Sequence, residues 1–302
     1  MPITKLEQMF DALKSKSKKR LVAAYAVDSH TIGAVSTAVD MGIIDATLVG
    51  DGAAIKKVCA EHKIDPGKFR IVQEADEMKA AIKAVDLINA GEGDVLMKGL
   101  VTSDKYMRAI LNKEKGLMAS QNSILSHVAV IETPNYPKLL IVSDVAIIPA
   151  PDLKQKIAMT NYIITTAHAL GIDNPKVALL AATEQMSIGM QACIDAAIIA
   201  KMADRGQIKG AIVDGPLALD VCVDKESCEI KKLKSPVGGD ADCILFPNIE
   251  SANVFFKTNT KLCGAELGAV VFGAKVPAVL TSRGDSEKTK LYSIALAAML
   301  AK

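Results

Sequence analysis

The chain has 302 residues, half of them hydrophobic, which is enough to bury one large core or two smaller ones. Its 36 basic and 34 acidic residues nearly cancel, which disfavours duplex DNA and anionic membranes as the main partners. Only 4% of the residues are aromatic and Trp is absent, which argues against a stacking platform for single-stranded nucleic acid.

Cysteine and histidine usage gives no sign of a metal site. The six cysteines include no C-x-x-C pair and the four histidines are scattered singly, so we expect no bound metal. Two G-x-G segments, at 50–52 and 91–93, lack the third glycine of a dinucleotide-binding fingerprint. The sequence shows neither a charged-then-apolar leader nor an apolar run of about 18 residues. We therefore expect a cytoplasmic protein with reduced thiols and no permanently bound cofactor.

In chain order, the first third alternates apolar runs with amphipathic stretches. The pattern predicts helices at 4–17, 29–41, 53–62, 74–90 and 103–111, and strands at 20–27, 46–50, 69–72 and 94–99. Strands that alternate with helices are typical of a parallel sheet covered on both faces, so the fold class is α/β.

The pattern changes after residue 124. Two apolar runs, LSHVAVIE and KLLIVSD, are separated by TPNYP, which predicts an antiparallel hairpin added to the sheet. The alternation then resumes with helices at about 153–170, 190–204 and 251–262, strands at 177–182, 210–214, 243–247, 269–273 and 277–281, and a final helix that ends near residue 299. The charged stretch 220–240 is predicted to be irregular.

The exit of the last strand carries the first candidate site. The apolar run 276–280 ends in Thr-Ser-Arg-Gly at 281–284, directly before the final helix. Ligands collect at the carboxyl ends of parallel strands, where helix N-termini attract anions. Arg283 offers a planar, permanently charged fork suited to phosphate or to a polarised carbonyl. The alternative is that Arg283 only pairs with Asp285 or Glu287 on the surface.

The segment MKGLVTS places four further candidates at another strand exit. Lys98 is a point charge, Gly99 allows close backbone approach, and Thr102 and Ser103 offer hydroxyl groups at the start of the next helix. Together they suit a phosphate cradle, although the P-loop pattern is absent. The alternative for Ser103 is a plain helix cap.

The predicted hairpin has polar residues where its strands begin and end. Ser126 and His127 begin one strand, and Asp144 follows the other. A lone histidine before an apolar run is either a catalyst or a satisfied structural residue, and Asp144 either lines a cleft or caps a turn.

The segment AIVDGPLALD is predicted to end its strand at Asp214, so that Gly215 and Pro216 begin a loop and Asp220 follows in a turn-rich segment. Two carboxylates near a phosphate site could act as a general base or as anchors for backbone amides.

The segment FPNIESANVFFK adds three donors. Asn248 lies at a strand exit, and Asn253 and Lys257 follow on the next helix. They either contact an anionic substrate or serve as a cap, in the case of Asn248, and as a solvated charge, in the case of Lys257.

In their order and spacing, the motifs MKGLVTS, LSHVAVIE, DRGQIKGAIVDGPLALD, FPNIESANVFFKT and VPAVLTSRGDS resemble the phosphate acetyl/butyryltransferase family over nearly the whole chain. The resemblance implies reversible acyl transfer, acyl-CoA + phosphate giving acyl phosphate + CoA, with butyryl or a similar short chain. It also implies two α/β domains with an interdomain cleft, similar to isocitrate and isopropylmalate dehydrogenases. The first domain would comprise 1–148 plus 269–302, and the second 149–268.

The resemblance also assigns roles to residues. The family's serine–arginine pair falls on Ser282 and Arg283, where the serine would bond the CoA sulfur and the arginine would hold the acyl phosphate and stabilise its carbonyl oxygen. Acetyl-specific relatives have an aspartate seven positions after the serine, but this chain has Thr289 there. The general base is therefore left open, with Asp214 preferred, and the acyl group is expected to pass directly within a ternary complex.

Three other readings remain open at this point. The enzyme could use acetyl-CoA as its main substrate, or the chain could be a regulator that binds CoA or acyl phosphate without turnover. A dehydrogenase-like decarboxylase would need a metal-binding aspartate cluster and a nucleotide-binding stretch that the sequence lacks. The resemblance implies a homodimer or a larger homo-oligomer whose other partners are acyl-CoA, phosphate and acyl phosphate, with no role for nucleic acid or membrane.

Overall fold

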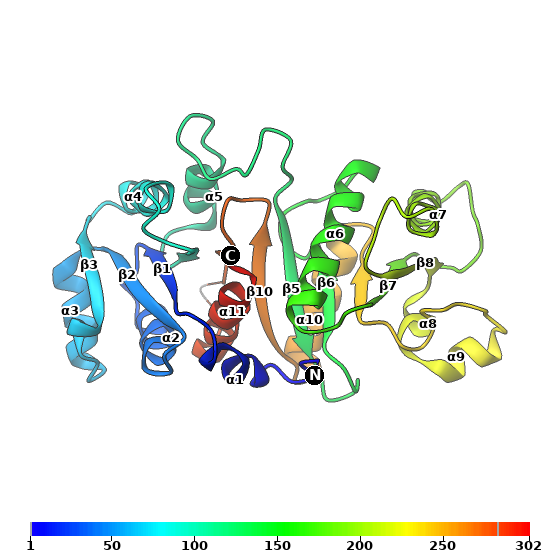
Figure 1. The fold of residues 1–302 in the computed structure, drawn as a ribbon, viewed down its shortest axis with the longest axis horizontal. Coiled ribbons are helices and arrows are strands. Elements are labelled where there is room, and N and C mark those ends of the chain that lie inside the picture. Colours follow the sequence, from blue (N-terminus) through cyan, green and yellow to red (C-terminus); the bar gives the residue numbers. More distant parts are fainter. Residues whose placement is uncertain (1, 283) are drawn as a thin grey trace. The chain divides into compact units, whose positions relative to one another are not determined.

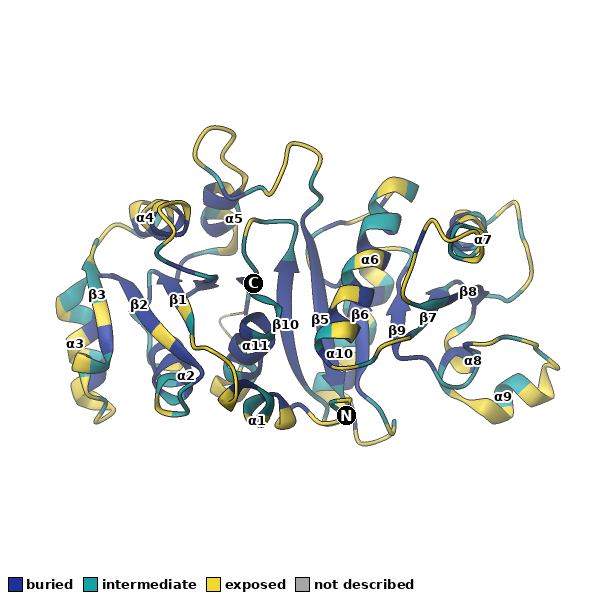
Figure 2. Ribbon diagram, viewed as in Figure 1, coloured by how far each residue is buried: buried dark blue, intermediate teal, exposed yellow. Residues whose placement is uncertain are grey.

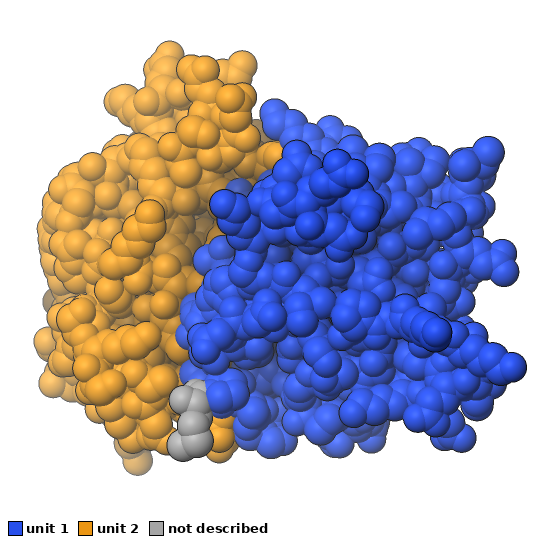
Figure 3. All heavy atoms as spheres, turned by 45° about the vertical axis from the view of Figure 1, so that its right-hand side comes forward, with its two compact units in different colours: residues 1–6, 126–267 blue, residues 7–125, 268–302 orange. Residues whose placement is uncertain are grey.

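The computed structural model describes residues 2–282 and 284–302 (Figure 1). The chain divides into two compact units, coloured separately in Figure 3. Unit 1 comprises the N-terminal residues up to Leu6 together with Ser126–Leu267, and unit 2 comprises Glu7–Leu125 together with Gly268–Lys302. The domain boundaries predicted from the sequence stay a prediction. They differ from these units in the N-terminal residues up to Leu6 and in residues 126–148, which fall in unit 1 here, and at Gly268, which falls in unit 2.

Unit 2 is built on mostly parallel strands. They are β1 (Lys19–Ala24), β2 (Ile44–Gly50), β3 (Phe69–Gln73), β4 (Val95–Lys98), β11 (Ala278–Val279) and most of β10 (Glu266–Phe272). Their order is β3-β2-β1-β4-β11-β10. All neighbours are parallel except β10 and β11, which pair antiparallel through Val271 and Ala278. Except for the edge strand β3, the strands are largely buried, as their dark colour in Figure 2 shows.

The helices of unit 2 fall into two groups around these strands. They are α1 (Gln8–Lys14), α2 (Ser29–Asp40), α3 (Gly52–Glu61), α4 (Glu77–Asn89), α5 (Ser103–Leu111) and α11 (Glu287–Leu300), with a short 3-10 turn at Pro66–Lys68. Helix α4 packs with α5, whereas α2 packs with α3 and α11, and α11 also packs with α1. In Figure 1, α4 and α5 are drawn toward the top of these strands, and α1 and α2 toward the bottom.

Unit 1 repeats the same construction with a hairpin at its start. Its strands are β5 (Ser126–Glu132), β6 (Leu140–Ser143), β7 (Lys176–Leu180), β8 (Ile212–Leu217) and β9 (Cys243–Leu245), in the order β5-β6-β9-β7-β8. Its helices are α6 (Leu153–Ala169), α7 (Gln191–Asp204), α8 (Leu219–Val223), α9 (Lys225–Ile230) and α10 (Ile249–Leu262). Strands β5 and β6 are antiparallel and the other pairs are parallel. The predicted α/β class and the predicted hairpin are therefore confirmed.

Polar caps explain where several of these helices begin. Asp28 accepts a hydrogen bond from the N–H of Thr31 at the start of α2, and Ser286 accepts one from Thr289 at the start of α11. Asp152 and Gln155 form a reciprocal capping box at the start of α6. Each cap satisfies an N–H group that has no partner within its helix. None of the helices in the described part of the chain has both the length and the apolar character needed to span a bilayer.

Four sequence predictions need correction. The opening helix is shorter than 4–17, since α1 covers only Gln8–Lys14, and the last strand is reduced to β11. The stretch predicted to be irregular contains α8 and α9. The strand predicted at 210–214 continues to Leu217, because its backbone pairs with β7 as far as Leu180. Pro216 is compatible with this strand, since β8 is the last in the strand order and one edge needs no N–H donor.

Candidate active site

In unit 2, the strand exits that carry the predicted residues lie at the same edge of the sheet. Parallel register pairs Ala24 of β1 with Lys98 of β4, and Met97 of β4 with Val279 of β11. The chain therefore leaves β4 and β11 on the same side, so the 98–103 and 280–282 segments emerge from adjacent strands.

Lys98 and Gly99 occupy buried positions at this edge. The ammonium group of Lys98, which is 2% exposed, donates to the carbonyl oxygens of Gly99 at 3.2 Å and Val101 at 2.9 Å. A side chain at Gly99 would lie only 2.6 Å from the carbonyl oxygen of Tyr25, so only glycine fits there. Lys98 therefore shapes the 98–101 turn, and Gly99 allows that turn to pack against the end of β1.

Thr102 and Ser103 take different roles. Thr102 caps α5, and its own backbone N–H donates to the carboxylate of Glu77 at 2.6 Å. Glu77 also pairs with Lys105, and the hydrogen bond from Lys105 is the largest cause that lowers the pKa of Glu77. The cap is therefore Thr102, one residue before the predicted Ser103, which is exposed. The start of α5 already holds a carboxylate where the sequence suggested a phosphate.

The turn after β11 carries Ser282. Its side chain is exposed, its backbone N–H donates to the carboxylate of Asp285 at 2.7 Å, and its hydroxyl accepts from the N–H of Gly284 at 3.4 Å. Arg283, the predicted partner of Ser282, lies outside the described residues. Thr289 belongs to the N-terminal cap of α11, where its N–H and hydroxyl contact Ser286, so no carboxylate occupies the position of the relatives' aspartate.

Behind this turn lies a lysine that the sequence analysis did not single out. Lys290 of α11 is 3% exposed, and its ammonium group donates to the hydroxyl of Thr281 at 3.0 Å and to the carbonyl oxygen of Ser282 at 3.4 Å. Burial lowers the pKa of Lys290, and the charges of Asp28 and Asp285 act in the opposite direction. The only sign in the sequence that Lys290 is buried is its place directly before the mostly apolar run 291–300 of the final helix.

In unit 1, the structure brings together the candidates of the hairpin. The hydroxyl groups of Ser126 and Ser143 lie 2.9 Å apart, and the backbone N–H of His127 donates to the carboxylate of Asp144 at 3.1 Å. Asp144 also accepts from two N–H groups of the turn that follows it, and Asn253 donates to the carbonyl oxygen of Val145 at 2.9 Å. Ser126, His127 and Asp144 are all buried. The contacts of Asp144 are therefore those of a residue that caps a turn.

Asp214 lies inside β8 rather than at a loop. One carboxylate oxygen accepts from the N–H of Gly215 at 2.8 Å, and the other accepts from the hydroxyl of Ser235 at 2.5 Å. A side chain at Gly215 would meet Leu179 at 2.6 Å, so glycine is required where β8 packs against β7. Pro216 follows within the same strand.

Asp220 and Lys257 are both exposed in unit 1. Asp220 forms an ion pair with Lys231 at 2.8 Å, and Lys231 also pairs with Glu184 at 2.9 Å. The hydrogen bond from Lys231 is the main cause that lowers the pKa of Asp220. Lys257 is exposed, and its ammonium group lies 4.9 Å from the centre of the Phe256 ring.

Asn248 is a helix cap that also lines a pocket. It caps α10 by accepting from the N–H of Ser251 at 3.0 Å, and it also lines a pocket of about 440 Å³. This pocket lies where β7 and β9 end, and most of its lining is apolar. The residues that line it are Ala150, Pro151, Lys156, Ala181, Ala182, Met190, Gln191, Ala192, Pro247 and Asn248.

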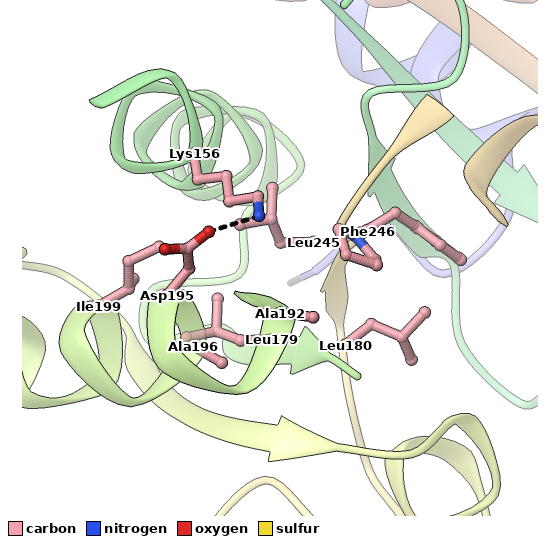
Figure 4. A pocket seen from close by; sticks show the side chains of 10 residues that line it. Lys156, Leu179, Leu180, Ala192, Asp195, Ala196, Ile199, Leu245 and Phe246 are labelled. Atoms are coloured by element: carbon pink, nitrogen blue, oxygen red, sulfur yellow. Dashed lines mark hydrogen bonds and ion pairs between the residues drawn. The ribbon is translucent and has the colours of Figure 1, made fainter. Parts of the chain in front are cut away.

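A buried ion pair lies beside this pocket, in the wall of a smaller cavity (Figure 4). The ammonium group of Lys156 lies 2.6 Å from the carboxylate of Asp195, and both side chains are almost fully buried. Asp195 also accepts from Gln191 at 2.8 Å. Leu179, Ile199 and other apolar side chains surround the pair. The sequence analysis missed both charges, although each lies on the buried stripe of its helix.

Each unit thus has exposed polar side chains at the carboxyl edge of its sheet, Ser103 and Ser282 in unit 2 and Asn248 in unit 1, and such an edge is suited to anionic substrates. Among the described residues, no group of three or more His, Cys, Asp or Glu side chains is arranged to hold a metal ion.

Solved structures with this fold define the class of protein. A branched-chain phosphotransacylase from Enterococcus faecalis V583 is 29% identical, with a TM-score of 0.80 over 93% of this chain and 98% of that one. The family model described as Phosphate acetyl/butaryl transferase matches residues 5–81 and 73–298. The chain belongs to this family, which confirms the resemblance drawn from its motifs.

Curated relatives cover the chain almost completely. The phosphate butyryltransferase of Clostridium acetobutylicum is 44% identical over 99% of both chains. The phosphate acetyltransferase of Rhizobium meliloti is 37% identical over 99% of this chain and 94% of its own length. Both acyl-chain readings are therefore represented among the relatives, with the higher identity on the butyryl side.

Proposed function

We propose that this protein transfers a short acyl group, butyryl or one of similar size, between coenzyme A and inorganic phosphate in both directions. In the forward direction an oxygen of phosphate attacks the thioester carbonyl, the C–S bond breaks, and the thiolate takes up a proton to leave as CoA. The observation that carries this proposal is the 44% identity to a phosphate butyryltransferase along the whole of both chains.

The proposed roles begin with the turn after β11. Ser282 bonds the CoA sulfur, and Arg283 holds the acyl phosphate and stabilises the negative charge that develops on the carbonyl oxygen. An aimed donor of this kind contributes roughly 3 to 4 kcal/mol to a reaction barrier. The exposed side chain of Ser282 supports its role, because a reacting hydroxyl must be accessible to the substrate.

Asp214 is the proposed general base. Its carboxylate already accepts two hydrogen bonds, but a carboxylate has about four lone-pair sites and can accept a thiol proton as well. The remaining candidates, in Lys98–Ser103, Ser126–His127, Asp144, Gly215–Asp220 and Asn248–Lys257, are proposed to bind or surround the substrates.

Further parts of the proposal rest on family membership. They are the isocitrate dehydrogenase-like arrangement in two domains, a homodimer or larger homo-oligomer, a cytoplasmic location, and coenzyme A and phosphate as substrates without a permanent cofactor. The second candidate function is a phosphate acetyltransferase, which is favoured by the 37% identity to the Rhizobium meliloti enzyme.

One assay tests the activity. The protein is mixed with butyryl-CoA, phosphate and a thiol reagent, without added metal or NAD, and the release of free CoA is followed. We expect phosphate-dependent release that is faster with butyryl-CoA than with acetyl-CoA. A reversed preference would favour the acetyl alternative. No release from acetyl-, propionyl-, butyryl- or branched acyl-CoA would contradict acyl transfer altogether.

A further inference from the structure

Lys290 lies where a lysine is costly. It is the fourth residue of α11, it is 3% exposed, and the residues that follow it in the helix are mostly buried and apolar. Removing an ammonium group from water is unfavourable unless it is paired, and the N-terminal end of a helix carries a partial positive charge that repels it. Methionine or leucine would fill the same space without these costs.

The contacts of Lys290 all lead toward the turn that carries Ser282. Side chains in helices lean toward the N-terminus, so the ammonium group reaches back past the first turn of α11. It donates to the hydroxyl of Thr281 at 3.0 Å and to the carbonyl oxygen of Ser282 at 3.4 Å. The carboxylate of Asp285 holds the same residue at its other backbone polar group: it accepts a hydrogen bond from the N–H of Ser282 at 2.7 Å. Both backbone polar groups of Ser282, its N–H and its carbonyl oxygen, are therefore hydrogen-bonded to side chains.

Burial lowers the pKa of Lys290, whereas the charges of two carboxylates raise it. Asp285 belongs to the turn itself, and Asp28 belongs to the start of α2, which packs against α11. One oxygen of Asp28 caps α2 through Thr31, whereas its other oxygen, Oδ2, is buried and accepts no hydrogen bond from any residue that the structure describes. The negative charge of Asp28 is thus available to favour the charged form of Lys290.

This arrangement fixes the backbone of Ser282 while its side chain stays exposed. A reacting group held in one orientation reacts faster than a mobile one, and a misplacement of 1 Å can cost about a hundredfold in rate. Lys290 lies in the first turn of α11, and Asp28 is the N-cap residue of α2. Both side chains are therefore attached to helices, which hold them more rigidly than loops would.

We propose that Lys290 is a positioning residue for acyl transfer: its ammonium group holds the Thr281–Ser282 segment so that the Ser282 hydroxyl is aimed at the substrate, with Asp28 as the supporting carboxylate. Lys290 itself does not contact the substrate. The inference rests on the proposed function, in which Ser282 bonds the CoA sulfur.

The main test replaces Lys290 with Met and measures kcat, KM for both substrates, and thermal stability. We expect kcat to fall roughly tenfold or more because the turn is no longer held, while KM changes less than about threefold. The melting temperature should stay the same or rise, since a buried charge replaced by an apolar side chain is often neutral or stabilising. A structural role alone would lower activity and stability together.

The matched control is Lys288→Met, on the same helix but half exposed, which should retain the wild-type kcat. A folded Lys290→Met enzyme with kcat within twofold of wild type would overturn the proposal. If the Met variant does not fold, Lys290→Arg is compared with Lys290→Gln. The proposal requires Arg, which keeps the charge, to be at least about fivefold more active, and equal activity would overturn it.

Asp28→Asn tests the supporting carboxylate. Asparagine can still cap α2, so the change removes mainly the charge that faces Lys290. We expect a smaller loss of kcat than for Lys290→Met, and almost no further loss when Asp28→Asn is added to Lys290→Met. Fully additive effects would exclude the coupling. If wild-type protein shows no acyl transfer, the proposed function fails; if wild type is active and Lys290→Met is unaffected, only this inference fails.

Discussion

Lys156 of unit 1 and Lys290 of unit 2 occupy equivalent places but are held in different ways. Each is the fourth residue of its helix and is at most 5% exposed. Lys156 contacts a carboxylate on the neighbouring helix α7, at 2.6 Å, whereas the hydrogen bonds of Lys290 go to uncharged oxygens of the segment before its own helix.

The difference separates two uses of a buried charge. The Lys156–Asp195 pair joins two helices, and the positive charge of Lys156 is neutralised by the carboxylate that it contacts directly. The ammonium group of Lys290 instead donates hydrogen bonds to the Thr281–Ser282 segment, so the position of that segment depends on Lys290. A buried charge pair is weak evidence for stability in itself, but removing one partner is strongly destabilising. Substitutions in the two regions should therefore affect different measurements.

The largest effect is expected from Asp195→Ala, which leaves Lys156 buried without its counter-charge. Breaking a buried pair in this way costs about 3 to 5 kcal/mol of unfolding free energy. Urea unfolding followed by circular dichroism measures it. The double variant Lys156→Met, Asp195→Leu should recover most of the lost stability. If Asp195→Ala costs less than 1 kcal/mol, Lys156 has another way to satisfy its charge and the contrast with Lys290 disappears.

The second effect concerns catalysis rather than stability. Arg283→Ala should lower turnover by roughly a hundredfold or more while the fold is kept, because one oxyanion donor is lost. CoA release under saturating substrates measures the rate. Arg108→Ala, a change of an exposed arginine on α5, is the matched control and should leave the rate unchanged. A near-normal rate for Arg283→Ala would rule out the oxyanion role.

Asp214→Asn extends the test to unit 1. If Asp214 takes the thiol proton, the variant should lose roughly tenfold or more in kcat, since general base catalysis contributes at least that much. Asparagine keeps the size of the side chain, so the packing of β8 should be preserved. Asp204→Asn, an exposed aspartate of α7, serves as the control. An unchanged kcat would rule out Asp214 as the general base.

The smallest effect is expected from Glu77, whose ion pair with Lys105 is partly exposed. Its folded-state pKa is lowered mainly by the hydrogen bond from Lys105, so the carboxylate stabilises the fold above its unfolded pKa. That stability is lost as the pH falls through the lower, folded pKa. Glu77→Gln should therefore cost less than about 1 kcal/mol at pH 7 and nothing at strongly acidic pH. Melting curves of both proteins between about pH 3 and pH 7, a range that brackets the unfolded-state pKa of glutamate of about 4.3, measure this difference in stability. Equal losses of stability at both ends of the range would contradict the prediction.

The sequence by itself determined the fold class, the hairpin and the family. These follow from local signals: the period of apolar residues, the turn residues between 132 and 138, and motifs that can be read without knowing which segments meet. The caps at Asp28 and Ser286 could also be foreseen, because each cap bonds a backbone N–H only three residues away.

Contacts between distant segments were decided only by the tertiary structure. Asp214 was predicted to be the last residue of its strand because its apolar run ends there, but backbone pairing with β7 carries the strand on to Leu217. Lys156 and Asp195 are 39 positions apart, so neither helix's own period reveals that the other supplies its counter-charge. Lys290 was likewise given no role by the sequence analysis, because packing against α2 and β11 determines which side of its helix is excluded from water.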